Sequence, residues 1–125
     1  MRTLFTLEAQ TKATVGEVFK NKNCLIDTHT AVAIHAAKSY ACDYKAERKI
    51  LAVSTASPYK FASDVFLSVS GKEPQNELSA LEELAELSGV EIPTPLCGLA
   101  NKEIRHKGTI NKDEMESATL EFARS

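Results

Sequence analysis

The sequence predicts an α/β fold, in the form of a partial domain in which helices pack on one or a few short strands of a larger parallel sheet. Two observations lead to this prediction. Helical patterns fill most of the 125 residues, and one short apolar run, Lys49–Ser54 (KILAVS), has the near-continuous hydrophobicity of a strand buried on both faces. Because one strand cannot form a sheet, the remaining strands are either short and poorly marked in the sequence or lie on a different polypeptide.

Two helices are predicted before this run. The first covers Thr6–Lys20, and its first residue is a suitable N-cap, although Gly16 in its middle lowers the helix propensity. The second covers Thr28–Tyr44, is capped by Asp27 or Thr28, and is dominated by alanines. Small residues at this density allow close approach of a neighbour, so we expect this helix to be buried on more than one side.

Three further helices are predicted after the run. One begins with Ser57 as N-cap and Pro58 at the first helical position, and Gly71 ends it. The next extends from Pro74 to Gly89, with leucines every three residues that we interpret as core rather than as a partner-binding zipper. The last begins at Asn111, with a glutamate three residues later as in a capping box.

Composition excludes several classes of function. Lys plus Arg number 15 against 17 Asp plus Glu, giving a net charge of −2, which argues against a dedicated nucleic-acid binder or a polybasic membrane anchor. No apolar run approaches the roughly 20 residues that span a bilayer. The first residues lack the features of a secretory signal, and the three cysteines (Cys24, Cys42, Cys97) are odd in number and far apart. We therefore expect a cytoplasmic protein with reduced thiols.

The segment from Ser54 to Phe61 is the first candidate site. A predicted strand ends there, hydroxyl residues follow, and a helix begins, which is where ligands bind in open α/β sheets. The free N–H groups of the helix N-terminus favour an anion or a polar ring atom there, and Lys60 could add a positive charge. In the structural alternative, Ser57 caps the helix, Thr55 completes the turn and Lys60 is solvated.

The second candidate is the start of the alanine-rich helix, where Asp27 or His29 could act as acid, base or ligand in a pocket. The alternative is a capped helix with a partly buried histidine. A metal site is not expected, because His29 and His35 lack the i, i+4 spacing and no CxxC pair occurs. Dinucleotide and P-loop signatures are absent, and no catalytic residue is assigned from the pattern.

Three segments carry a resemblance to a known family. LIDTHTAVA (Leu25–Ala33) resembles the LIDPHTAVA segment of threonine synthases, and VSTASPYKF (Val53–Phe61) resembles their STAHPAKF-like segment, at a matching distance along the chain. The tail PTPLCGLANKEIRHKGTINKDEME (Pro93–Glu116) is similar to the C-terminal stretch of that family. The sequence departs from the family pattern at Thr28, where proline is usual, and at Ser57, where histidine is usual.

The resemblance implies a pyridoxal 5'-phosphate enzyme of the fold type shared with tryptophan synthase β chains, which converts O-phosphohomoserine and water to threonine and phosphate. In such enzymes a Ser or Thr hydroxyl contacts the pyridine nitrogen, and the matching residue is Thr55. By the same resemblance, Asp27 and His29 become pocket-shaping residues, and Ser54, Ser57 and Lys60 are expected to line the pocket. A small-molecule substrate is the expected partner, with no nucleic acid and no membrane.

The resemblance also implies that this is a C-terminal piece. The family's Schiff-base lysine and its glycine-rich phosphate loop lie in the N-terminal two-thirds of the enzyme, and no lysine here sits in a matching motif. We therefore expect the chain alone to be inactive and to self-associate through exposed apolar faces. The alternatives are a free-standing, non-catalytic α/β module that binds a small anion at Thr55 to Lys60, and an interaction domain that uses the leucine helix.

Overall fold

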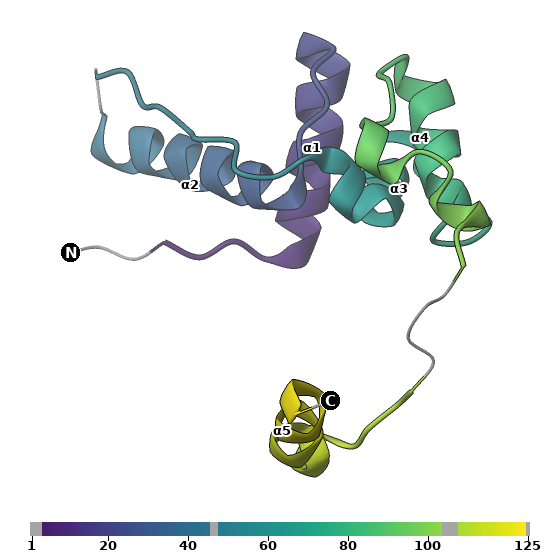
Figure 1. Cartoon of the computed structure of the whole chain (residues 1–125). Coiled ribbons are helices and arrows are strands. Elements are labelled where there is room, and N and C mark those ends of the chain that lie inside the picture. Colours follow the sequence, from purple (N-terminus) through teal and green to yellow (C-terminus); the bar gives the residue numbers. More distant parts are fainter. Residues whose placement is uncertain (1–3, 46–47, 104–107, 125) are drawn as a thin grey trace.

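The structure, a computed structural model, describes residues 4–45, 48–103 and 108–124, and within these ranges it is helical (Figure 1). The α-helices are α1 (Glu8–Lys22), α2 (Thr28–Tyr44), α3 (Ala62–Ser70), α4 (Ser79–Ser88) and α5 (Met115–Arg124). Short 3-10 helices are η1 (Pro58–Phe61), η2 (Thr94–Leu96), η3 (Leu99–Asn101) and η4 (Lys112–Glu114).

The predicted α/β fold is wrong, because the described part of the chain contains no strand and no sheet. The run Lys49–Ser54 instead turns back along α2 as an irregular segment (Figure 1). Its side chains Leu51 and Val53 are 87% and 65% exposed. A strand needs a neighbour with unpaired backbone N–H and C=O groups, and those of the adjacent helix are already paired within it. Apolar composition alone therefore could not reveal that this run lacks a strand partner.

The five predicted helices are present, but only the second keeps its predicted bounds. The first ends at Lys22 rather than Lys20, and the third and fifth open with the 3-10 helices η1 and η4. The second helix, α2, has the predicted bounds. The first begins at Glu8 rather than Thr6, because the Leu7 N–H donates to the Gln10 side chain over 2.8 Å. The fourth, α4, begins five residues after Pro74, because the Asn76 side chain accepts from the backbone at the start of the helix, over 2.9 and 3.0 Å. Polar side chains that bond to nearby backbone therefore set these boundaries.

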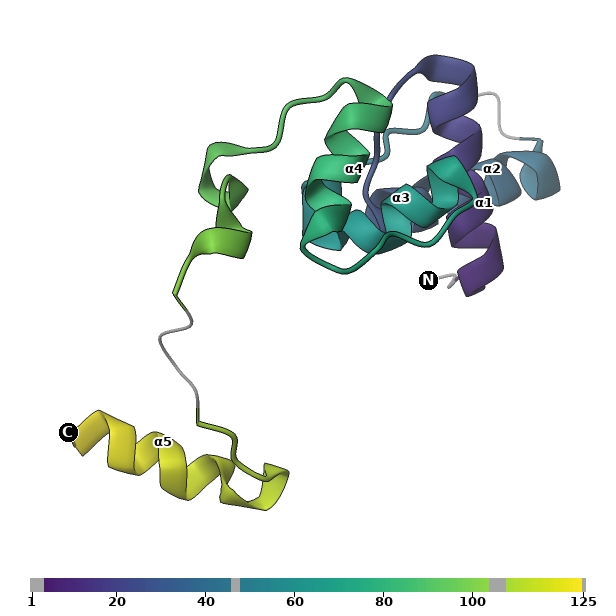
Figure 2. The ribbon, with the colours of Figure 1, turned by 90° about the vertical axis from the view of Figure 1, so that its right-hand side faces the viewer.

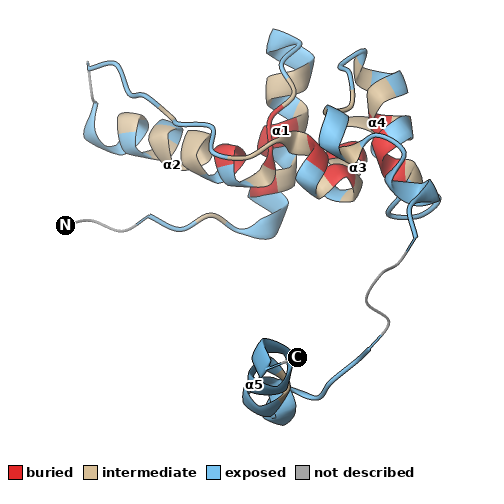
Figure 3. Ribbon diagram, viewed as in Figure 1, coloured by how far each residue is buried: buried red, intermediate tan, exposed pale blue. Residues whose placement is uncertain are grey.

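The core lies where α1 crosses α2 and α3 and where α4 packs on α3 (Figure 3). Its buried members are Val15, Ile26, Ala31, Tyr59, Ala62, Val65, Phe66, Ala80, Leu81 and Leu84. Two of the leucines in the α4 stripe, Leu81 and Leu84, belong to this core, as predicted for the stripe. The other two, Leu78 and Leu87, are about 45% exposed.

Gly16 marks the closest approach of α1 to α3. A Cβ atom at this position would lie 2.5 Å from the backbone carbonyl oxygen of Ser68. Glycine costs helix propensity in the middle of α1, but any larger residue would push the two helices apart. Gly16 thus lowers the helix propensity of α1 but permits its close packing on α3.

The last helix stands apart from the other four (Figure 2). Its entry is the predicted capping box: the Asn111 N–H donates to Glu114 Oε2 over 2.9 Å. No residue of α5 is buried. The candidate site therefore depends on the four helices α1 to α4 and on the segment between α2 and η1.

Candidate functional site

Asp27 is the buried anchor at the start of α2. Its side chain is 0% exposed, and Oδ1 accepts from the backbone N–H of His29 (2.8 Å) and of Thr30 (3.3 Å). The Thr30 hydroxyl donates to Oδ2. Burial raises the pKa of the Asp27 carboxyl, but the hydrogen bonds from Thr30 and His29, aided by attraction to the His29 ring, outweigh it and the pKa is lowered. The group therefore acts as an ionised helix cap, which is the structural role predicted for it.

Thr30 extends this anchor to a distant part of the chain. Its side chain is buried, and Oγ1 lies within hydrogen-bond distance of Ser54 Oγ, at 3.1 Å. A hydroxyl has one proton, and that of Thr30 goes to the Asp27 carboxylate. Ser54 must then donate to Thr30. A polarised chain Ser54–Thr30–Asp27 thus ties the segment before η1 to the N-terminus of α2.

Thr55 follows the anchored serine and is exposed. Among the described residues its hydroxyl has no hydrogen-bond partner, so it can donate to an external acceptor. A hydroxyl can donate to a ring nitrogen, which is the role that the resemblance implies for Thr55. The hydroxyl of Thr55, which has no partner among the described residues, thus follows directly after Ser54, whose hydroxyl is bonded to Thr30.

His29 lies on the outer side of the same helix start. Its side chain is 65% exposed, its Nδ1 lies 3.4 Å from Asp27 Oδ1, and its ring packs on Phe61 with centroids 5.0 Å apart. This contact joins α2 to η1. Asp27 thus contacts His29 directly and is linked to Ser54 through Thr30. Their role in shaping a pocket stays a prediction.

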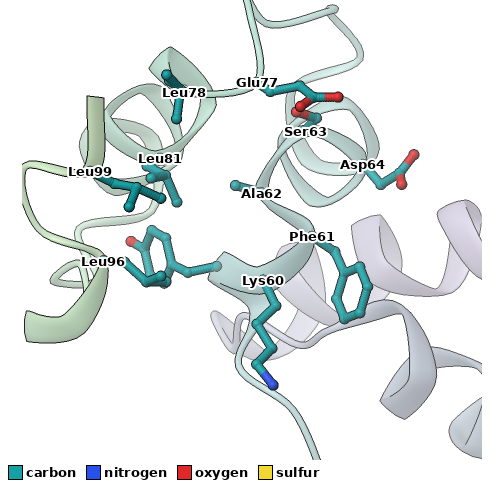
Figure 4. A pocket seen from close by; sticks show the side chains of 11 residues that line it. Lys60, Phe61, Ala62, Ser63, Asp64, Glu77, Leu78, Leu81, Leu96 and Leu99 are labelled. Atoms are coloured by element: carbon teal, nitrogen blue, oxygen red, sulfur yellow. The ribbon is translucent and has the colours of Figure 1, made fainter. Parts of the chain in front are cut away.

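The remaining predicted residues follow the structural alternative. Ser57 Oγ accepts from the Tyr59 N–H over 3.3 Å and so caps η1. Lys60 is exposed, and among the described residues it has no ion pair. Lys60 lines the cavity of Figure 4, and its amine points away from the leucine side chains there. Neither side chain contacts Thr55, so the geometry does not bring the three residues together in one site.

A cavity of about 480 Å³ that sequence reasoning missed is lined by η1, including Lys60, by the start of α3 and by leucines that follow in the chain. In Figure 4, leucines from α4 and from the 96–99 segment gather on one side of it, and Ala62 points between them. The Tyr59 hydroxyl, which donates to the Val90 carbonyl oxygen, fixes the wall of this cavity. Its leucines form i, i+3 pairs in the sequence, Leu78 with Leu81 and Leu96 with Leu99. This spacing is the feature of the sequence from which the cavity could have been predicted.

The described residues contain no cluster of three or more His, Cys, Asp or Glu side chains that could hold a metal ion. Searched over the same residues, no helix is long and apolar enough to cross a membrane. All three cysteines are free and exposed.

A comparison with known families gives one match that covers more than half of the chain. The profile described as "Threonine synthase, C-terminal" matches residues 30–116. The matched range starts at Thr30, includes Ser54 and Thr55, and ends near the start of α5.

Proposed function

Because the chain belongs to the threonine synthase C-terminal family, we propose that it forms the C-terminal part of a pyridoxal 5'-phosphate-dependent lyase of threonine biosynthesis. The reaction proposed for the complete enzyme is the conversion of O-phosphohomoserine and water to threonine and phosphate. The observation that carries the proposal is the family match over residues 30–116, which spans the anchored Ser54 and the free hydroxyl of Thr55.

Thr55 is the residue of this chain that we assign to the cofactor. Its hydroxyl would donate a hydrogen bond to the ring nitrogen. When bound, the cofactor supplies the electron withdrawal that the substrate carbons need, and a neutral hydroxyl partner limits that withdrawal compared with a carboxylate partner. Ser54 and Asp27 contribute by fixing the backbone before Thr55 rather than by touching the cofactor.

The chain alone is proposed to have no turnover. The resemblance puts the cofactor-anchoring lysine in another part of the enzyme, and the lysines of this chain do not lie in a matching motif. A hydroxyl contact orients a ring but cannot replace a covalent anchor. Assay of the purified 125-residue chain with O-phosphohomoserine should therefore show no release of phosphate above background.

The role of Thr55 is tested in full-length threonine synthase that carries this sequence. Thr55→Val removes the donor and keeps the shape, and loss of one hydrogen bond of about 1.5 kcal/mol predicts roughly tenfold weaker cofactor binding, measured by absorbance titration. Thr55→Ser should bind as the wild type does. Thr94→Val, at another exposed threonine, is the matched control. Equal affinity of Thr55→Val and wild type would refute the assignment.

The anion-binding module gains no support from the geometry. The 3-10 helix η1 has four residues, and the Tyr59 N–H near its start already donates to Ser57. The interaction domain is likewise not favoured, since Leu81 and Leu84 of the leucine stripe are buried in the core.

A further inference from the structure

Thr30 occupies an unusual place for a residue in the first turn of a helix. Its side chain is 4% exposed, and its hydroxyl touches two groups that lie 3 and 24 residues away in the sequence. The first contact completes the cap of α2. The second reaches across to Ser54, in a segment whose neighbours Leu51 and Val53 are exposed and contribute no core packing.

The polarity of this contact is fixed by chemistry. The ionised Asp27 carboxylate can only accept, so Thr30 donates to it and accepts from Ser54. Hydrogen bonds to a charged acceptor are stronger than neutral ones, and burial of both Asp27 and Thr30 keeps water from competing for the bond between them. Ser54 itself is exposed. It is held by two successive hydrogen bonds, the second of which ends on the buried Asp27 carboxylate.

We propose that Thr30 is a positioning residue that holds Ser54 in place and thereby fixes the backbone that presents Thr55. This step rests on the proposed function only for the role of Thr55, because the link from Thr30 to Ser54 is a property of the chain itself. The element that it positions is the irregular segment 48–57, which has no strand partner to order it.

The alternative for Thr30 is a purely structural role as a β-branched residue that fills space beside Asp27. Valine has the same shape and would serve that role equally well, whereas serine would keep the hydroxyl and lose only a methyl group. The pair Thr30→Val and Thr30→Ser therefore separates the two roles.

The test is backbone ¹⁵N relaxation of the 125-residue chain. In the wild type we expect rigid order parameters near 0.85 at Ser54 and Thr55, falling below about 0.6 in Thr30→Val and in Ser54→Ala. Thr30→Ser should retain the wild-type values. The matched control is Thr14→Val, because Thr14 is also buried in a helix and its hydroxyl donates only to the Gln10 carbonyl oxygen, over 2.7 Å.

Unchanged order parameters at Ser54 and Thr55 in Thr30→Val would overturn the inference, as would an equal loss in Thr14→Val. A second readout is the dissociation constant for pyridoxal 5'-phosphate in full-length threonine synthase, which should rise severalfold in Thr30→Val and recover in Thr30→Ser. If Thr30→Val loosens the segment but neither it nor Thr55→Val weakens cofactor binding, the positioning role stands and the proposed role of Thr55 fails.

Discussion

Replacement of Gly16 by alanine tests the crossing of α1 and α3. The added Cβ would lie 2.5 Å from the Ser68 carbonyl oxygen, and real Cβ atoms essentially never come closer than 3.0 Å. The two helices must therefore separate by about 0.5 Å or more, and overpacking of this kind costs about 1–3 kcal/mol. The oxygen belongs to backbone inside α3, so it cannot rotate away and the cost should fall in the upper part of that range.

Alanine also gains about 1 kcal/mol of helix propensity over glycine. The net expectation for Gly16→Ala is a loss of about 1–2 kcal/mol in the free energy of unfolding, measured by urea titration followed by circular dichroism. For a chain of this size that corresponds to a fall in Tm of about 3–10 °C. Gly108→Ala is the control, because a Cβ there meets nothing within 4 Å. Equal or higher stability of Gly16→Ala would refute the close crossing.

Three further predictions concern the core, the helix cap and the exposed apolar segment. Leu84 is 0% exposed, so Leu84→Ala should cost about 2–5 kcal/mol in the same urea titration, and a cost below 1 kcal/mol would contradict the core assignment. Burial raises the pKa of Asp27, but the hydrogen bonds that its carboxylate accepts lower the pKa on balance. The stability that the charge provides is therefore fully present above the unfolded pKa of about 3.9. It is lost as the pH falls through the lower pKa of the folded state. Unfolding free energies measured from pH 6 to pH 2 should therefore decline, and Asp27→Asn should be less stable at pH 6 and show a shallower decline; an unchanged pH profile would count against the cap. Leu51 is 87% exposed, so the wild type should self-associate at high concentration in analytical ultracentrifugation and Leu51→Asp should do so less, whereas a strictly monomeric wild type would contradict this prediction.

The sequence predicted the helices well where capping residues mark them. Asp27 is a strong N-cap, and α2 has the predicted bounds. The N-terminus of α4 was predicted too early because proline is a common first helical residue, as at Pro74. The Asn76 side chain instead accepts from the backbone N–H groups of Leu78 and Ser79, and the helix begins at Ser79. Local side-chain competition of this kind decides helix ends.

The strand prediction failed for a different reason. An apolar run of six residues indicates that burial of its side chains is favourable, but it does not indicate which segment covers them. Strand pairing depends on two segments, and the sequence of one does not identify the other. Here the run Lys49–Ser54 lies beside a helix and leaves Leu51 exposed. The α/β prediction depended on that one run and fell with it.

The sequence pointed to two ends of a hydrogen-bonded link but not to the residue between them. Asp27 and Ser54 were singled out, and the structure links them, but the residue that connects them, Thr30, was overlooked. The signal was present in the sequence, since a threonine three residues after an aspartate N-cap can return a hydroxyl to the cap. Its second contact joins residues 24 apart, and no local pattern reports such a contact.

The most direct test of the account is an assay of the complete open reading frame that contains this sequence. The purified, cofactor-loaded product is incubated with O-phosphohomoserine, and threonine and inorganic phosphate are quantified together. The account predicts equimolar release of both products, and none from the 125-residue chain alone. A folded, cofactor-loaded enzyme that releases neither product would contradict the proposed function.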